Sequence, residues 1–214
     1  MTTALNDPAQ ASSGADAFRS RLLDGLAQSI ADRGYRETTV ADVVRNAKTS
    51  KRTFYDQFAS KEECFLELLR ANNEHMIATI RGSVDPEAAW DDQVRSAATA
   101  YVDHIASQPA ITLSWIREAP AMGAVALPLH RLAMDQFADM LVDLTDSQGF
   151  RRVGLAPISR PLAVIVIGGL RELTATTVEA EGDVSEILEP AIIAALAILG
   201  PGSGRQQAAD SPQH

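Results

Sequence analysis

The stretch that decides the fold is "TTVADVVRNAKTSKRTFYDQFASKEECFLELL", residues 38–69. Thr39 and Ser50 each stand directly before a short segment with apolar residues at helical spacing. A Ser or Thr hydroxyl in such a position caps the start of a helix. The spacing predicts two short helices, 39–47 and 50–58, joined by a tight turn. Two helices joined in this way form a helix-turn-helix.

The second of these helices carries cations and aromatic rings on different faces. Phe54 and Phe58 lie four residues apart and are predicted to face the core. Lys51 and Arg52 lie at the start of the helix, beside Thr53. In a helix-turn-helix the second helix enters the DNA major groove, and its first residues meet base edges. The sequence therefore predicts a surface that binds an operator in double-stranded DNA.

Phosphate contacts are predicted from residues that flank this recognition helix. Tyr55 lies on its wetter flank, where the hydroxyl can donate to a phosphate. Lys61 lies in the first turn of a following helix, 60–80, whose backbone N–H groups suit an anion. The full set of predicted DNA-binding residues is Thr39, Lys48, Ser50, Lys51, Arg52, Thr53, Tyr55, Gln57 and Lys61.

The distribution of charge supports this assignment although the chain as a whole is acidic. The 214 residues carry a formal net charge of −9, which by itself argues against a nucleic-acid partner. Between residues 33 and 61, however, seven Lys and Arg face three acids. From residue 71 onward, nine Arg face eighteen Asp and Glu. The positive charge is therefore concentrated on the segment that is predicted to meet DNA.

The quoted stretch resembles the DNA-binding domain of the TetR family of bacterial transcriptional regulators. Three features match at fixed spacing: the helix "TVADVVRNA", the recognition helix "SKRTFYDQF" and the "SKE" that follows it. The resemblance covers roughly residues 18–70. One position departs from the family, which usually places Gly in the turn where this chain has Lys48. A positive φ at that position would strain a Lys modestly.

The resemblance implies an all-α homodimer, with an N-terminal three-helix helix-turn-helix DNA-binding domain and a C-terminal helical ligand-binding and dimerisation domain. Residues 16–65 are assigned to the first domain and 66–200 to the second. Composition predicts disordered tails at 1–15 and 201–214. In the first predicted helix, 16–33, Phe18, Leu22, Leu26 and Ile30 form one apolar stripe that ends at Gly34.

The second domain is predicted to contain about five further helices, and its last two to form the dimer interface. The predicted ranges are 88–107, 110–118, 124–146, 158–180 and 184–199. The helix at 158–180 is apolar on most of its circumference and contains Gly168 and Gly169, which suit close helix approach. The alternative is that both helices are simply the core of a monomer. Arg171 and Glu172 are interpreted as a partly buried pair or an interface contact.

Aromatic and Met residues of the middle helices could line an adaptable apolar pocket, although most of them could equally be ordinary core. The predicted effector contacts are Trp90, Tyr101, His104, Trp115, Met122, Met134 and Phe137. Further residues that could line the pocket are Ile105, His130 and Met140. Trp115 and Phe137 are preferred because they are large residues on the middle helices.

Several other classes of protein lack support in the sequence. The four His show no metal-ligand spacing, so neither a metal nor another cofactor is expected. No nucleophile-elbow or P-loop spacing indicates an enzyme. The single cysteine, Cys64, is expected to be a buried, inert thiol, and its lack of a disulfide partner suits the cytoplasm. The longest apolar run, residues 162–170, is too short for a membrane helix, and the N-terminus does not resemble a secretory signal.

The function predicted from these features is a ligand-responsive transcriptional regulator. It is expected to be a homodimeric repressor that a small apolar or amphipathic effector releases from its operator. The alternative is a dimeric DNA-binding regulator with no small-molecule ligand.

Overall fold

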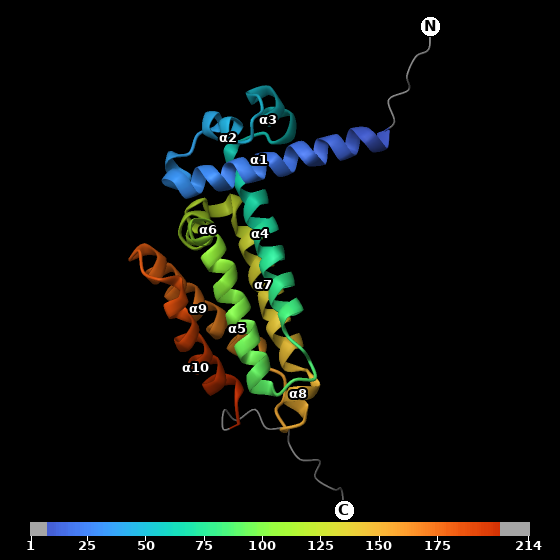
Figure 1. Cartoon of the computed structure of the whole chain (residues 1–214), viewed down its shortest axis with the longest axis vertical. Coiled ribbons are helices and arrows are strands. Elements are labelled where there is room, and N and C mark those ends of the chain that lie inside the picture. The colour runs from blue at the N-terminus through green and yellow to red at the C-terminus, as the bar shows by residue number, and fades with distance from the viewer. Residues whose placement is uncertain (1–7, 202–214) are drawn as a thin grey trace, which may run out of the picture. The chain divides into compact units, whose positions relative to one another are not determined.

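The computed structural model describes residues 8–201, with side chains from residue 17 onward, and every regular element in that range is a helix (Figure 1). The chain divides into two compact units, residues 1–71 and 72–214. The boundary falls inside α4 (Lys61–Ser83), a few residues after the one expected from the sequence. Of the tails expected at residues 1–15 and 201–214, residues 1–7 and 202–214 lie outside the described residues, whereas residues 8–15 are helical and belong to α1. The first helix begins at Pro8, earlier than the predicted Asp16.

The N-terminal unit consists of α1 (Pro8–Glu37), α2 (Val40–Asn46), α3 (Lys51–Gln57) and the first part of α4. Leu22, Leu26 and Ile30 are buried, as their spacing predicts. Phe18 was expected to join this stripe, but it is 40% exposed. Its ring lies instead against the Arg21 guanidinium, 4.5 Å away, one turn beyond the buried part of the stripe.

A glycine allows α1 and α2 to approach closely. A Cβ placed on Gly25 would lie 2.7 Å from the Val43 carbonyl oxygen and 2.9 Å from the Ala47 nitrogen, both of which are backbone atoms. Any larger residue would therefore push the two helices apart. At the other end of α1, Gly34 interrupts the helical geometry with a φ of 78°, in agreement with the predicted helix end.

Cys64 is fully buried in α4. Burial raises the pKa of its thiol to about 12. Because the thiolate is the reactive form, this environment agrees with the predicted inert thiol.

The C-terminal unit contains the end of α4 and the remaining helices (Figure 1). These are α5 (Trp90–Ser107), α6 (Pro109–Ala121), η1 (Gly123–Val125), α7 (Leu127–Thr145), α8 (Gln148–Arg151), α9 (Arg160–Glu179), η2 (Val184–Ile187) and α10 (Leu188–Leu199). In this unit α9 packs against α6 and α7, and α10 packs against α5.

The structure corrects three details of the helix prediction. The expected helix 124–146 is divided into η1 and α7, because Pro128 suits a first turn and not a helix interior. The expected helix 184–199 begins as η2, and Pro190 then stands in the first turn of α10. The short helix α8 was not anticipated in the segment assigned to a turn.

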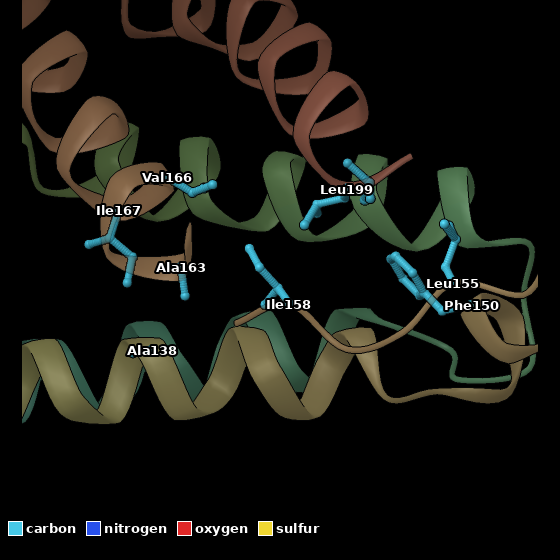
Figure 2. Packing of buried hydrophobic residues seen from close by; sticks show 9 residues of the cluster. Ala138, Phe150, Leu155, Ile158, Ala163, Val166, Ile167 and Leu199 are labelled. Atoms are coloured by element: carbon cyan, nitrogen blue, oxygen red, sulfur yellow. The ribbon is translucent and has the colours of Figure 1, made fainter. Parts of the chain in front are cut away.

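The main core of the C-terminal unit lies between α5, α7, α9 and α10 (Figure 2). Phe150 and Leu155 pack at one end of this cluster, near Leu199, while Ala163 and Ile167 of α9 lie at the other. A second cluster joins Met76 and Ile80 of α4 to α5 and α7. Together these clusters fix the helices that carry the predicted effector residues.

Within the described part of the chain, α9 is the one helix long and apolar enough to cross a membrane by length and composition. Its mean hydropathy reaches 1.3, and 28% of that apolar window is buried in the chain. Counting uninterrupted apolar residues missed this property because Arg171 and Glu172 interrupt the run. A core helix of a soluble protein has the same character, and α9 packs on α6 and α7.

Candidate functional site

A reciprocal cap between Thr39 and Asp42 fixes the start of α2. Thr39 Oγ1 accepts a hydrogen bond from the Asp42 N–H at 3.3 Å, and the Thr39 N–H donates to Asp42 Oδ2 at 3.0 Å. The hydrogen bonds from Thr39, and then that from Arg45, hold the pKa of Asp42 well below its ordinary value. Thr39 therefore acts as the predicted cap, and its contact with DNA stays a prediction.

The turn between α2 and α3 is closed by Lys48 in a left-handed conformation, with a φ of 51°. The Thr49 N–H donates to the Val44 carbonyl at 2.9 Å, and the Lys48 N–H donates to the Arg45 carbonyl at 3.2 Å. This pair of bonds is a Schellman motif, which normally uses Gly at the left-handed position. The strain expected at Lys48 is thus present, and its exposed side chain stands beside the recognition helix.

Replacing Lys48 with Gly is expected to separate the two effects of this residue. The variant should raise the free energy of unfolding by about 1 kcal/mol, because Gly adopts a left-handed conformation without steric cost. It should also weaken DNA binding and lower the salt dependence of that binding by about one charge, provided that Lys48 contacts a phosphate. Thermal unfolding and binding titrations would measure both quantities.

Lys48→Ala is the matched control, because it removes the charge but keeps a Cβ in the strained position. Equal stability of the Gly and Ala variants would contradict the strain. If both variants bind DNA as wild type does, Lys48 does not contact DNA.

The recognition helix α3 separates its faces as predicted. Its N-cap, Ser50, accepts a hydrogen bond from the Thr53 N–H at 3.1 Å. Phe54 and Phe58 are buried, with their ring centroids 5.8 Å apart. Tyr55 is 57% exposed and meets the Phe54 ring edge-on. Two aromatic residues of this segment, Phe54 and Phe58, therefore belong to the core, whereas Tyr55 lies at the surface.

Most of the residues predicted to contact DNA are accessible on the N-terminal unit. Lys51 and Arg52 are exposed at the first turn of α3, and Thr53 and Gln57 are partly exposed. Among the described residues neither Lys51 nor Arg52 has a salt bridge, so the ammonium and the guanidinium can both meet an incoming acceptor. The exposed members of the predicted set are Thr39, Lys48, Ser50, Lys51, Arg52 and Tyr55.

Lys61 lies in the first turn of α4, as predicted, but its ammonium is bonded within the N-terminal unit. Its ammonium donates to the backbone carbonyls of Tyr35 at 3.1 Å and Thr38 at 2.8 Å, and lies 4.3 Å from the centre of the Tyr35 ring. Two of its three N–H donors are therefore used to hold the end of α1. A contact between Lys61 and a DNA phosphate would therefore use the third N–H donor.

Arg19, which was not among the predicted site residues, holds the far end of the recognition helix. It donates to the Gln57 carbonyl at 3.3 Å and stacks over the Phe58 ring at 4.5 Å. It also pairs with Glu67 at 3.2 Å. No local sequence pattern predicts these contacts, because they join residues far apart in the sequence.

The predicted effector residues of the C-terminal unit do not all converge. Trp90 packs edge-on against Phe150 at the α8 end of the main core. His104 is buried and hydrogen-bonded to Asn72 at 3.1 Å. Met122 lies in the turn between α6 and η1, and Phe137 packs against both core clusters. Trp90 and His104 are therefore accounted for by ordinary core contacts.

Three of the predicted residues do gather, around polar groups of α7 and α9. The Tyr101 hydroxyl is hydrogen-bonded to Thr174 at 2.8 Å. The Trp115 ring lies 6.2 Å from that of His130, and Arg171 donates to the Met134 sulfur at 3.3 Å. Burial raises the pKa of Tyr101 and lowers that of His130. This is the polar part of the interior that an effector could use.

The predicted pairing of Arg171 with Glu172 is wrong, while the alternative of an interface contact stays a prediction. Neighbouring residues on a helix point in different directions, about 100° apart. Glu172 is exposed and pairs with Arg117 of α6 at 2.9 Å, and Glu179 pairs with the same guanidinium at 2.6 Å. Arg171 is partly buried and donates its hydrogen bond to the Met134 sulfur instead.

Comparison with known proteins agrees with the geometry of the N-terminal unit. Residues 22–68 match the model of "Bacterial regulatory proteins, tetR family". Over 70 residues the chain is 41% identical to the HTH-type transcriptional repressor KstR2 of Mycobacterium tuberculosis, which covers 33% of this chain and 35% of KstR2. Over 90 residues it is 27% identical to the HTH-type transcriptional activator FasR of Mycolicibacterium smegmatis, which covers 42% of this chain and 41% of FasR. The matches thus span little more than a third of these relatives.

The likeness of fold extends over most of the chain. FadR from Bacillus subtilis, solved in complex with stearoyl-CoA, matches with a TM-score of 0.70 at 16% identity, covering 86% of this chain and 98% of FadR. At this level of identity the likeness concerns the fold alone. The exposed recognition helix and its capped turn define a helix-turn-helix protein. The match of residues 22–68 to the tetR family model confirms the resemblance seen in the sequence.

Proposed function

We propose that this protein is a transcriptional regulator that binds an operator in double-stranded DNA through α3 and works in the cytoplasm. The observation that carries the proposal is the first turn of α3, where Lys51 and Arg52 are exposed above a fully buried Phe54 and have no ion-pair partner among the described residues. Repression is the mode suggested by KstR2, whereas FasR is named an activator. The residues that match are those of a family of regulators, which argues against an enzyme.

The proposed response to an effector works through the spacing of two recognition helices. A dimer must place these helices about 34–36 Å apart to enter successive major grooves. The helix α4 begins in the N-terminal unit and ends in the C-terminal unit, so it connects the two units. An effector that prefers the state with the wrong spacing would weaken DNA binding, typically by about 1–3 kcal/mol of coupling.

The proposed effector is an apolar or amphipathic small molecule bound within the C-terminal unit. Support comes from the aromatic and thioether side chains that gather between α5, α6, α7 and α9. The complex of FadR with stearoyl-CoA is an example of such a molecule bound to a protein of this fold. A regulator without a small-molecule ligand remains the alternative, and an effector that changes operator affinity would discriminate between them.

The proposed homodimer uses the outer faces of α9 and α10. Ile165 of α9 is 61% exposed and Ile193 of α10 is 64% exposed, although both lie in strongly apolar helices. Val164 adds a third exposed apolar side chain beside them. A second copy of the chain would cover these exposed apolar residues. It would also bury the part of the apolar helix α9 that its own chain leaves exposed.

Replacing Gly169 with Phe tests this interface. A Cβ at Gly169 meets no atom within 4 Å in its own chain, so the variant should fold normally. If a second copy packs there, overpacking should weaken the dimer by about 1–3 kcal/mol. Sedimentation over a range of protein concentrations would measure the change, and circular dichroism would check folding. A dimer of unchanged strength, or a wild-type monomer at micromolar concentration, would contradict the proposed interface.

The experiment that tests the proposed function begins with an operator selected by the full-length protein from random duplex DNA. We expect selection of a sequence with two related half-sites, centred one helical turn or a multiple of it apart. Enrichment of no sequence above the starting pool would refute it. Addition of candidate amphipathic molecules to the complex then separates a ligand-responsive regulator from one that has no effector.

A further inference from the structure

Arg171 differs from the other described arginines of the C-terminal unit. Arg95 and Arg131 are exposed to solvent. The rest pair with carboxylates: Arg81 with Asp143, Arg117 with Glu172 and Glu179, Arg151 with Asp146, Arg152 with Glu87, and Arg160 with Asp135 and Asp139. Arg171 is partly buried, and among the described residues no carboxylate lies within ion-pairing distance of it. Its hydrogen bond goes to the Met134 sulfur, a weak acceptor.

The lack of a carboxylate beside Arg171 is unusual for this chain. From residue 71 onward, acids outnumber arginines two to one, eighteen against nine. Burial lowers the pKa of Arg171, and the nearby Arg117 charge acts in the same direction. A guanidinium that loses water without gaining an anion destabilises the fold. The position of Arg171 is therefore costly unless something outside the chain pairs with it.

Two further polar groups of the C-terminal unit are buried without a hydrogen-bond partner in the described structure. They are Nδ1 of His130 and Oγ1 of Thr112. His130 is close enough for the Arg171 charge to lower its pKa, after the larger effect of burial. Thr112 lies one turn before Trp115 on α6, and the Trp115 ring lies against His130. Buried polar atoms of native proteins are rarely left unpaired.

These groups have the chemistry of a site for an anion attached to an apolar molecule. Guanidinium matches the planar geometry of a carboxylate and donates to it from two N–H groups. A threonine hydroxyl and a protonated imidazole nitrogen supply further donors. Trp115 and Met134 present apolar surface beside the same point. On α5, the Tyr101 hydroxyl is hydrogen-bonded to Thr174 and forms the remaining side of this site.

We propose that Arg171 binds the carboxylate of an amphipathic acid, whose apolar part lies against Trp115 and Met134. The statement deepens the proposed function, since it names the chemical class of its effector. Arg171 makes the ion pair, Thr112 and His130 complete the hydrogen bonds, and the neighbouring rings and thioether contact the chain of the acid. The site combines residues of α5, α6, α7 and α9: Tyr101, Thr112, Trp115, His130, Met134 and Arg171.

The test compares acids with neutral analogues of the same chain length. Octanoate, decanoate and dodecanoate, and the three matching alcohols, are titrated into the full-length protein by calorimetry. Wild type is expected to bind at least one acid tenfold or more tightly than its alcohol. Arg171→Gln should lose this preference and bind acid and alcohol alike. Arg131→Gln is the matched control, because it removes an exposed charge from α7 and should leave the preference intact.

Thermal unfolding of the ligand-free variants separates binding from a structural role. Arg171→Gln should be at least as stable as wild type, because it removes a buried cation that has no anion. A marked loss of stability would show that Arg171 holds the fold and would overturn the proposal. Dissociation of the dimer by Arg171→Gln would identify a partner copy as the source of the missing anion, and would also overturn it. So would a panel in which no acid is preferred to its alcohol.

DNA binding distinguishes failure of this site from failure of the proposed function. If an acid binds through Arg171 without changing operator affinity, the site stands and the ligand response is refuted. If an alcohol releases the operator equally well in wild type and Arg171→Gln, the regulator responds to a ligand, and the proposed acid site is refuted.

Discussion

Phe54→Ala is expected to destabilise the N-terminal unit by about 3–5 kcal/mol, the usual cost of removing a large aromatic side chain from a core. Phe54 is completely buried, and its ring contacts those of Tyr55 and Phe58. The cavity would lie directly beneath α3. Thermal or denaturant unfolding would show the loss, and DNA binding should fall with the folded fraction.

Tyr55→Ala is the matched control for this prediction. It removes a ring from the next position of the same helix, but this ring is largely exposed. Its effect on stability should stay within about 0.5 kcal/mol, while its binding to all DNA sequences should weaken alike. If Tyr55→Ala unfolds the protein as strongly as Phe54→Ala, the assigned faces of α3 are wrong.

Arg52→Ala is expected to weaken binding to the selected operator by about 1–3 kcal/mol, roughly a five- to 150-fold loss of affinity. Arg52 lies in the first turn of α3, the part of a recognition helix that meets base edges. Stability should not change, because the Arg52 side chain is exposed and has no ion-pair partner in the part of the chain that the structure describes. Fluorescence anisotropy at several salt concentrations would measure the affinity and its salt dependence.

Arg95→Ala provides the control for charge alone, since Arg95 is an exposed arginine of the C-terminal unit. It should bind the operator as wild type does. Lys61→Ala should differ from both, because loss of its bonds to the Tyr35 and Thr38 carbonyls weakens the junction of α1 and α4. Unchanged binding by Arg52→Ala and Lys61→Ala at moderate salt would mean that α3 is not the recognition helix.

The N-terminal unit could be predicted in detail because local rules determine most of it. Thr39 and Ser50 cap their helices through residues three positions away, and the four-residue spacing of Phe54 and Phe58 gives the buried face. The strain at Lys48 follows from its place in the turn. In each case the sequence neighbours supply the interaction, so no knowledge of the tertiary structure is needed.

Other features depend on contacts that the sequence does not display. Lys61 bonds to carbonyls 23 and 26 residues away, which changes its expected role. Helix α8 was missed because it is held from outside, where the Gly149 N–H donates to the Pro86 carbonyl at 3.1 Å. A Cβ on Gly149 would approach the Ala88 carbonyl oxygen to 2.1 Å, so this packing requires glycine.

The effector region was only partly predictable for a similar reason. Aromatic and Met residues of amphipathic helices look alike whether they line a binding site or fill a core, as Trp115 and Trp90 illustrate. Arg171 carried the more informative signal, a charge within an apolar helix. Its sequence neighbour Glu172 suggested an ion-pair partner. The structure shows instead that Glu172 pairs with Arg117.

The measurement that tests the central claim most directly is a specificity map of Arg52. Wild type and Arg52→Ala are titrated against a panel of operators, each with one base pair replaced in both half-sites. Because a base contact confers discrimination at its own position, the variant should lose preference at one position in each half-site and keep it elsewhere. A variant that retains the complete wild-type pattern, with only a uniform change in affinity, would contradict base recognition by the first turn of α3.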